Sequence, residues 1–296
     1  MAAATPYKFV VAVDGSVHAN RAVEYLVRSA VGLRPCEVHL VHALALRIAR
    51  LLTPQQRDLL LQAGADTAVA RRMLDDAGIA YRFHSEAGNP PERIVDLVRS
   101  EKCDEVIVGS RGMSALDNIA LGSVAYKVVH LSPVPVTVVP NPFESSKLEQ
   151  AVGDGVHRIL LSVDGSAPAA RAVEYVCALR DACTPVEVRL LNVQIPIVSG
   201  HVLRFVTQDT IDAYCRAEGA DALDAAKKAL RSAGVAFSED IQIGHTGEII
   251  VREALQRGCT RIVMGTRGLG ALANVMLGST ALQVLHRSEL PVTLVK

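Results

Sequence analysis

Two copies of one glycine pattern hold the residues of this chain that are best suited to bind a ligand. In the first half, Gly109 and Gly112 are followed, after nine further residues, by Gly122 and Ser123. The second half repeats the spacing G-x2-G-x9-G-S with Gly265, Gly268, Gly278 and Ser279. Each copy follows a short apolar run and precedes a segment with helical periodicity. The pattern therefore predicts, in each half, a glycine loop between a buried strand and a helix.

Phosphate binding is the chemistry that suits such a loop. Glycine admits positive φ angles and, because it lacks a Cβ, lets a ligand approach the backbone. A helix that begins at Ser123 or Ser279 points free N–H groups at the loop, and its dipole favours an anion there. A single copy could be a plain turn. Two copies between the same kinds of element favour a phosphate site in each half.

A second repeated pattern, V-D-G-S, follows the first expected strand of each half and contains Asp14 and Asp164. One interpretation is structural, because an aspartate side chain often bonds to the backbone of the turn that begins the next helix. The other interpretation is a contact with a nucleotide or with its Mg²⁺, since hard oxygen ligands suit that ion. The residues leave both interpretations open.

The elements that position these motifs alternate between strands and helices. In the first half, apolar patterns predict strands at 9–13, 38–43, 80–85, 105–108 and 134–139 and helices at 17–31, 54–76, 91–100 and 123–131. The second half repeats this order. Such alternation indicates an α/β fold with a parallel, doubly wound sheet. A ligand site then belongs at the carboxyl ends of the strands, where the strand order reverses.

The repeat divides the 296 residues into two homologous domains. A polar stretch with proline, serine and glycine separates them and reads as a linker. We expect a first domain at 1–142, the linker at 143–156 and a second domain at 157–296.

Composition and charge exclude several classes of function. Lys plus Arg and Asp plus Glu both number 31, so no strongly basic protein and no nucleic-acid partner are expected. No apolar run approaches the roughly 20 residues of a membrane span, and the first residues do not resemble a signal peptide. The six cysteines form no CxxC, and no metal-ligand spacing is present. These features predict a cytoplasmic protein without a membrane partner.

The paired glycine signature and V-D-G-S resemble the universal stress protein family in its tandem form, over nearly the whole chain. The resemblance implies, in each domain, a five-stranded parallel sheet in the order 3-2-1-4-5 with helices on both faces. It implies ATP bound between the ends of strands one and four. It also implies pairing through the last strands, 134–139 with 292–295, between domains or in a homodimer.

Carried over residue by residue, the resemblance implies one nucleotide site in each domain. In the first, an aspartate lies beside the nucleotide, an apolar residue touches adenine, one glycine lies near the ribose and four residues surround the phosphates: Asp14, Ala43, Gly109, then Gly112, Gly122, Ser123 and Val124. The second site uses, in the same order, Asp164, Val193, Gly265, then Gly268, Gly278, Ser279 and Thr280. The ligand would be ATP, ADP or AMP, with Mg²⁺ reached through Asp14 or Asp164. Ala43 is smaller than the apolar residue common there, which predicts a weaker adenine contact.

The functional hypothesis is a stress-response regulator that binds an adenine nucleotide. Binding of the nucleotide would change its oligomeric state or its binding to an unknown regulatory protein partner. The alternative is a slow ATP hydrolase or a nucleotide-using transferase. No GxxxxGK[ST] P-loop and no G-x-S-x-G elbow occurs. Glu92 and Glu248 match across the repeat, but each opens a helix, where the dipole alone favours a carboxylate. No catalytic residue is predicted. A scaffold without a ligand is a third hypothesis, which two intact loops disfavour.

Three further matched pairs carry less information. Arg111 and Arg267 occupy the same loop position and are either solvated or a clamp on the outer phosphates. Cys103 and Cys259 precede the fourth strand, where packing or a redox role would explain them. The last pair, His130 and His286, suits a helix C-terminus.

Overall fold

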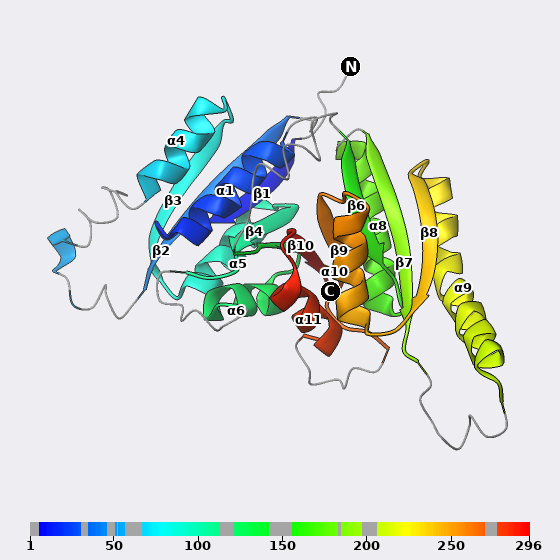
Figure 1. The fold of residues 1–296 in the computed structure, drawn as a ribbon. Helices are drawn as coiled ribbons and strands as arrows, with labels where there is room; N and C mark the ends of the chain where they lie inside the picture. Colours follow the sequence, from blue (N-terminus) through cyan, green and yellow to red (C-terminus); the bar gives the residue numbers. More distant parts are fainter. Residues whose placement is uncertain are drawn as a thin grey trace. The chain divides into compact units, whose positions relative to one another are not determined.

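The computed structural model of this chain describes residues 6–30, 35–45, 51, 53–56, 67–112, 121–141, 156–182, 185–196, 206–269 and 277–296. The chain forms two compact units, Met1–Gly155 and Val156–Lys296. Each unit is an α/β domain with a parallel sheet, as the alternating patterns predicted (Figure 1).

The first unit is built on a sheet in which every described pairing within the unit is parallel. Its strands are β1 (Tyr7–Ala12), β2 (Cys36–Ala45), β3 (Tyr81–Gly88), β4 (Glu105–Gly109) and β5 (Val136–Val139), and they lie in the order β3-β2-β1-β4-β5. Its helices are α1 (Val17–Ser29), α4 (Ala68–Asp76), α5 (Pro90–Glu101) and α6 (Ser123–Leu131). Of the long helix expected at 54–76, the end is present as α4, while residues 57–66 lie outside the described residues.

The second unit repeats this arrangement, again with parallel pairings only among its described strands. Its strands are β6 (His157–Ser162), β7 (Val186–Gln194), β8 (Ala236–Ile243), β9 (Arg261–Gly265) and β10 (Val292–Val295), and they lie in the order β8-β7-β6-β9-β10. Its helices are α8 (Ala167–Ala182), α9 (Gln208–Ser232), α10 (Thr246–Gln256) and α11 (Ser279–Arg287).

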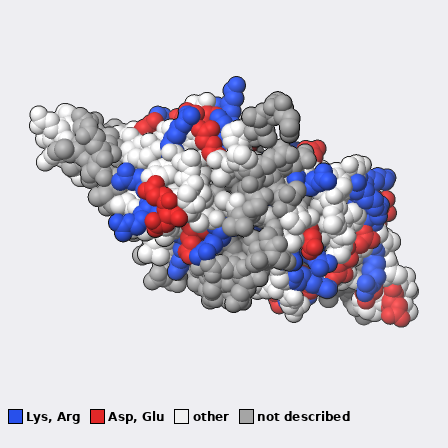
Figure 2. All heavy atoms as spheres, turned by 90° about the horizontal axis from the view of Figure 1, so that it is seen from above, with Lys and Arg blue, Asp and Glu red and all other residues white. Residues whose placement is uncertain are grey.

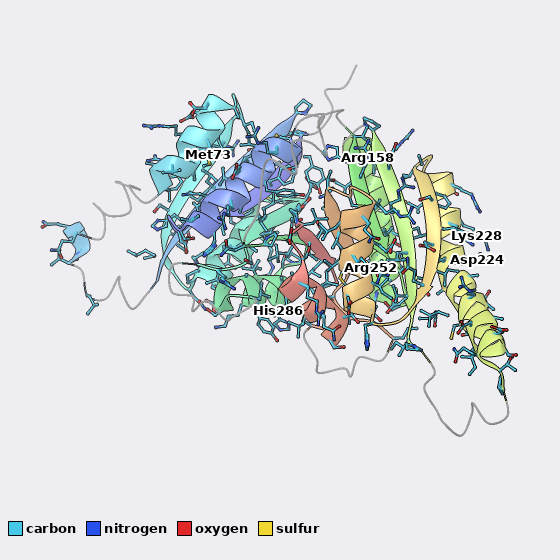
Figure 3. The ribbon with its side chains drawn as sticks, in the orientation of Figure 1. Met73, Arg158, Asp224, Lys228, Arg252 and His286 are labelled. Carbon is cyan, nitrogen blue, oxygen red and sulfur yellow. The ribbon has the colours of Figure 1, made fainter. Side chains whose placement is uncertain are left out.

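Helices cover both faces of each sheet. In the first unit α1 packs beside α4, and α5 packs beside α6 on the opposite face (Figure 1). The second unit pairs α8 with α9 and α10 with α11 in the same way. Helix α1 is held by apolar residues at helical spacing, since Ala19, Ala22, Val23 and Leu26 are all buried. Met73 of α4 packs against the same core (Figure 3).

The two units differ in a buried polar position at the start of the fourth strand. In the first unit Glu105 is 1% exposed and accepts hydrogen bonds from the hydroxyl groups of Tyr7 and Thr137, at 3.2 and 2.5 Å. In the second unit the matching residue is Arg261, which is 7% exposed and donates to the Tyr175 hydroxyl at 3.2 Å. A buried acid in one sheet therefore corresponds to a buried base in the other.

Surface charges are mixed. Figure 2 shows basic and acidic side chains of the described residues interspersed on the face that it presents. Among the described residues, no helix has the length and apolar character needed to cross a membrane.

Candidate functional site

The central strands of each sheet send the chain to opposite faces. After β1 the chain enters α1, whereas after the adjacent β4 it leads to α6 on the other face. The same divergence follows β6 and β9, which lead to α8 and α11. A crevice outside the carboxyl ends of two such strands is the usual ligand site of a doubly wound sheet. Both repeated motifs follow these strands, so the structure brings them together in each unit.

The turn between β1 and α1 is organised by Asp14 and Ser16. One carboxylate oxygen of Asp14, Oδ1, accepts the Ser16 N–H at 3.0 Å. Ser16 in turn caps α1, because its hydroxyl oxygen accepts the Ala19 N–H at 3.1 Å. Gly15 between them has φ 81°, a left-handed angle that favours glycine. The structural interpretation of the aspartate is therefore confirmed for one of its oxygens.

The turn between β6 and α8 has the same construction. Asp164 Oδ1 accepts the Ser166 N–H at 3.0 Å, and Gly165 has φ 80°. Ser166 Oγ accepts the Ala169 N–H at 3.3 Å at the start of α8. The repeated V-D-G-S sequence thus forms the same turn twice.

Gly109 and Gly265, the first glycines of the two loops, are needed for packing. A Cβ on Gly109 would lie 2.6 Å from the carbonyl oxygen of His18 in α1. A Cβ on Gly265 would lie 2.8 Å from Pro168 Cβ and 2.9 Å from the backbone nitrogen of Ala169. Each glycine lets the end of the fourth strand contact the first turn of the unit's first helix, α1 or α8.

The second glycines lie directly against the aspartates. A Cβ on Gly112 would be 2.8 Å from Asp14 Oδ2, and a Cβ on Gly268 would be 2.5 Å from Asp164 Oδ2. Asp164 Oδ2 also accepts the backbone N–H of Leu269 at 3.3 Å. The turn that contains the aspartate, called the aspartate turn below, is therefore in contact with the glycine loop in both units.

The third glycines close the loops. Gly122 N–H donates to the Ser110 carbonyl at 2.7 Å, and Gly278 N–H donates to the Thr266 carbonyl at 2.8 Å. Positive φ is one reason expected for these glycines, but Gly122 has φ −65° and none of the six signature glycines has a positive φ. That expectation is wrong. Close approach of neighbouring atoms explains the first and second glycines of each loop, whereas a Cβ on Gly122 or Gly278 would come no nearer than 3.3 or 3.4 Å to its neighbours.

The helices that follow begin without a side-chain cap. Gly122 is the N-cap of α6 and carries no side chain that could bond to the first turn, which begins with exposed Ser123 and half-buried Val124. Gly278 caps α11 in the same way ahead of Ser279 and Thr280. The first N–H groups of a helix have no partner within it, so these two helix ends are suited to bind an anion.

Ala43 and Val193 lie beyond the end of the neighbouring first strand. The Val13 N–H donates to the Val41 carbonyl at 2.9 Å, and Ala43 follows two residues later with its side chain half-buried. Val193 has the corresponding place on β7. Both residues are thus on the strand next to the aspartate turn, at the same edge of the sheet.

Three matched pairs have structural explanations. Glu92 lies in the first turn of α5 and accepts a hydrogen bond from the Asn89 amide at 2.6 Å, while Glu248 lies in the first turn of α10. His130 and His286 lie in the last turns of α6 and α11 (Figure 3 labels His286). Burial raises the pKa of the Cys103 thiol to about 12 and that of the matched Cys259 thiol to about 11, so neither is a ready nucleophile.

The donor set near the aspartates does not form a protein-held metal centre. Among the described residues, no group of three or more His, Cys, Asp or Glu side chains is placed to hold a metal ion. Both oxygens of Asp164 accept backbone N–H groups, from Ser166 and Leu269. A Mg²⁺ ion beside Asp164 would therefore have to compete with these two N–H groups.

The sequence patterns did not predict the hydrogen bonds between the β6–α8 turn and the second glycine loop. Ser166 Oγ donates to the Arg267 carbonyl at 3.3 Å, next to the Leu269 contact with Asp164. The serine was part of the repeated V-D-G-S motif, and its place just before a helix is a sequence signal for a cap. Its bond to a residue about a hundred positions away has no sequence signal, because it depends on which strands are neighbours.

Comparison with known proteins identifies relatives of this arrangement. The model of the universal stress protein family matches residues 7–140 and 155–296. A universal stress protein of Synechocystis sp. is 25% identical over 280 residues, which cover 93% of this chain and 85% of that protein. Another, from Mycolicibacterium smegmatis, is 24% identical over 304 residues, covering 99% and 98%. The crystal structure of a universal stress protein from Archaeoglobus fulgidus, 23% identical, covers 98% of this chain and 96% of its own, with a TM-score of 0.66.

Proposed function

Because this chain belongs to the universal stress protein family, with one family match in each half, we propose that each unit binds one adenine nucleotide at its glycine loop. The protein then acts as a cytoplasmic stress-response regulator whose oligomeric state or protein partner depends on the nucleotide. The observation that carries this proposal is the repeated contact between the aspartate turn and a glycine loop that ends at a helix without a side-chain cap.

The phosphates bind at the helix N-termini. In the first unit the backbone of Gly122, Ser123 and Val124 surrounds them, and Gly112 forms the opposite side of the loop. The positive end of the α6 dipole favours an anion at this place. In the second unit the corresponding residues are Gly268, Gly278, Ser279 and Thr280.

The base and sugar lie toward the neighbouring strands. Adenine contacts Ala43 in the first unit and Val193 in the second, and the ribose lies near Gly109 or Gly265. The aspartate turn borders the site on the α1 or α8 side. Ala43 offers less apolar surface than Val193, so the first unit has the lower affinity for adenine.

Binding and not turnover is the main activity of this site. Phosphoryl transfer needs charge neutralisation on the leaving phosphates and an oriented nucleophile. The helix N-termini supply part of the first requirement. For the second, the matched acid Glu92 accepts a hydrogen bond from the Asn89 side-chain amide in the first turn of α5, where the helix dipole favours a carboxylate.

Denaturing the purified protein and identifying the released nucleotide is the direct test. Titration calorimetry with ATP and Mg²⁺ should then give about two sites per chain, and size-exclusion chromatography should differ with and without nucleotide. Steady-state phosphate release should stay below roughly 0.01 per second, far under the ordinary enzyme range of about 1–10³ per second. Absence of any bound or titratable adenine nucleotide would refute the proposal. Turnover near 1 per second would replace it with an ATP hydrolase.

A further inference from the structure

Three consecutive residues of the second glycine loop contact the β6–α8 turn. The Arg267 carbonyl accepts the Ser166 hydroxyl at 3.3 Å. Gly268 lies so close to Asp164 Oδ2 that a Cβ would be 2.5 Å from that oxygen. Leu269 donates its N–H to the same oxygen at 3.3 Å. The turn therefore bonds a carbonyl and an N–H group of the loop, one on each side of Gly268.

The two oxygens of Asp164 join the turn to the loop. Oδ1 accepts the Ser166 N–H inside the turn, and Oδ2 accepts the Leu269 N–H inside the loop. Hydrogen bonds to a charged carboxylate are stronger than those between neutral groups. The carboxylate thus bridges two backbone segments that are far apart in sequence and leave neighbouring strands.

We infer that Asp164 is a positioning residue, whose carboxylate clamps the start of the glycine loop to the β6–α8 turn and presets the loop for a phosphate, with no role as a Mg²⁺ ligand. This assignment explains why the second position of the signature is glycine. A side chain at position 268 would displace the Asp164 oxygen from its present place, so glycine lets this oxygen reach the loop. The same close approach occurs between Gly112 and Asp14, with 2.8 Å from a Cβ to Oδ2.

The clamp itself is tested on the nucleotide-free protein by amide hydrogen exchange of a peptide that covers 266–269. Asp164→Ala should raise its exchange rate by about tenfold or more, because a hydrogen bond to a charged group is lost. Asp164→Asn is the second variant. It can still accept the Ser166 N–H, but it turns an NH₂ group toward the Leu269 N–H, so it should also release the loop. Unchanged exchange in both variants would overturn the clamp.

Two further variants separate the clamp from helix capping. Ser166→Ala should release the loop partly, whereas Ser16→Ala removes the matched cap of α1 and should leave 266–269 unchanged. A double-mutant cycle tests the role of glycine: Gly268→Ala should raise exchange in the wild-type background and add nothing in the Asp164→Ala background. Additive effects of these two substitutions would contradict the assignment.

The consequence for binding rests on the proposed function and is read separately. In a Gly122→Val background, ADP affinity of the second unit should fall by a similar factor in Asp164→Ala with saturating Mg²⁺ and with EDTA. A loss confined to the Mg²⁺ condition would make Asp164 a metal ligand and refute the inference. Failure of the parent protein to bind ADP would refute the proposed function, while the exchange experiment would still decide the clamp.

Discussion

Replacing Gly122 by valine separates the fold from the phosphate site. Gly122 has φ −65° and ψ 156°, angles that any residue adopts. A Cβ there would lie 3.3 Å from Arg111 Cα and 3.4 Å from the Ser110 carbonyl oxygen, so the neighbours need to move by only a few tenths of an ångström. The two methyl groups of valine extend further, at the start of α6 where we place the phosphates.

The expected loss of stability is modest. Glycine is a better N-cap than an apolar residue by about 1 kcal/mol, and the tight contacts add a similar amount at most. A total of about 1–2 kcal/mol lowers the melting temperature by about 2–8 °C, which leaves the fold intact. The expected loss of binding is larger. Blocking two hydrogen bonds to a charged phosphate removes about 3–6 kcal/mol, or about 10²–10⁴ in Kd.

Calorimetry with ADP and thermal unfolding measure the two effects in the same samples. Gly278→Val is the matched variant for the second unit, and each single variant should leave one site. Gly109→Ala is the contrasting control, because its Cβ would lie 2.6 Å from a backbone carbonyl and should destabilise the fold more than Gly122→Ala does. Normal ADP affinity in both valine variants would refute phosphate binding at these helix ends. If the valine variants unfold, Gly122→Ala carries the test.

Two further predictions concern buried titratable groups. His39 is fully buried, with Nδ1 3.1 Å from His84 Nε2, and burial lowers its pKa while Glu37 opposes the shift. As the pH falls below about 6.5, this histidine takes up a proton in the unfolded chain before it does so in the folded protein. The free energy of unfolding, measured by denaturant titration, should therefore decrease from pH 7.5 to 5, and His39→Gln should flatten that dependence. Because burial raises the pKa values of Cys103 and Cys259 to about 12 and about 11, both thiols should be alkylated far more slowly in the native protein at pH 8 than after denaturation; rapid native labelling would restore a redox role.

The α/β architecture was predictable because its signals are local. Apolar runs, helical periodicity and turn residues set most elements to within a few residues, as at Ser123–Leu131, which matches α6. The expected strand 134–139 begins later, at Val136, because Pro135 cannot donate a backbone N–H; its carbonyl instead accepts the Val106 N–H. Helix α4 is described only from Ala68.

The sequence predicted that the two repeated motifs lie at one edge of each sheet, but not the contacts that require these residue types. Spacing alone located the glycines and Asp164 near a common edge of the sheet. It could not show that Gly268 faces a carboxylate oxygen, because that contact joins segments brought together by strand order. Likewise, the φ angle of Gly122 depends on how the loop closes onto Ser110.

The exchange of a buried acid for a buried base between the two sheets limits how the halves of the gene can recombine. A crossover that brought the Arg261 codon into the first half would place a guanidinium beside the hydroxyl groups of Tyr7 and Thr137, which now donate to Glu105. The reverse event would set a carboxylate beside Tyr175 in place of its present donor. A first half that carried arginine at this position should therefore fold less stably than the present one, because both hydroxyl groups would lose their acceptor. The two halves therefore share one fold but not one set of buried polar partners.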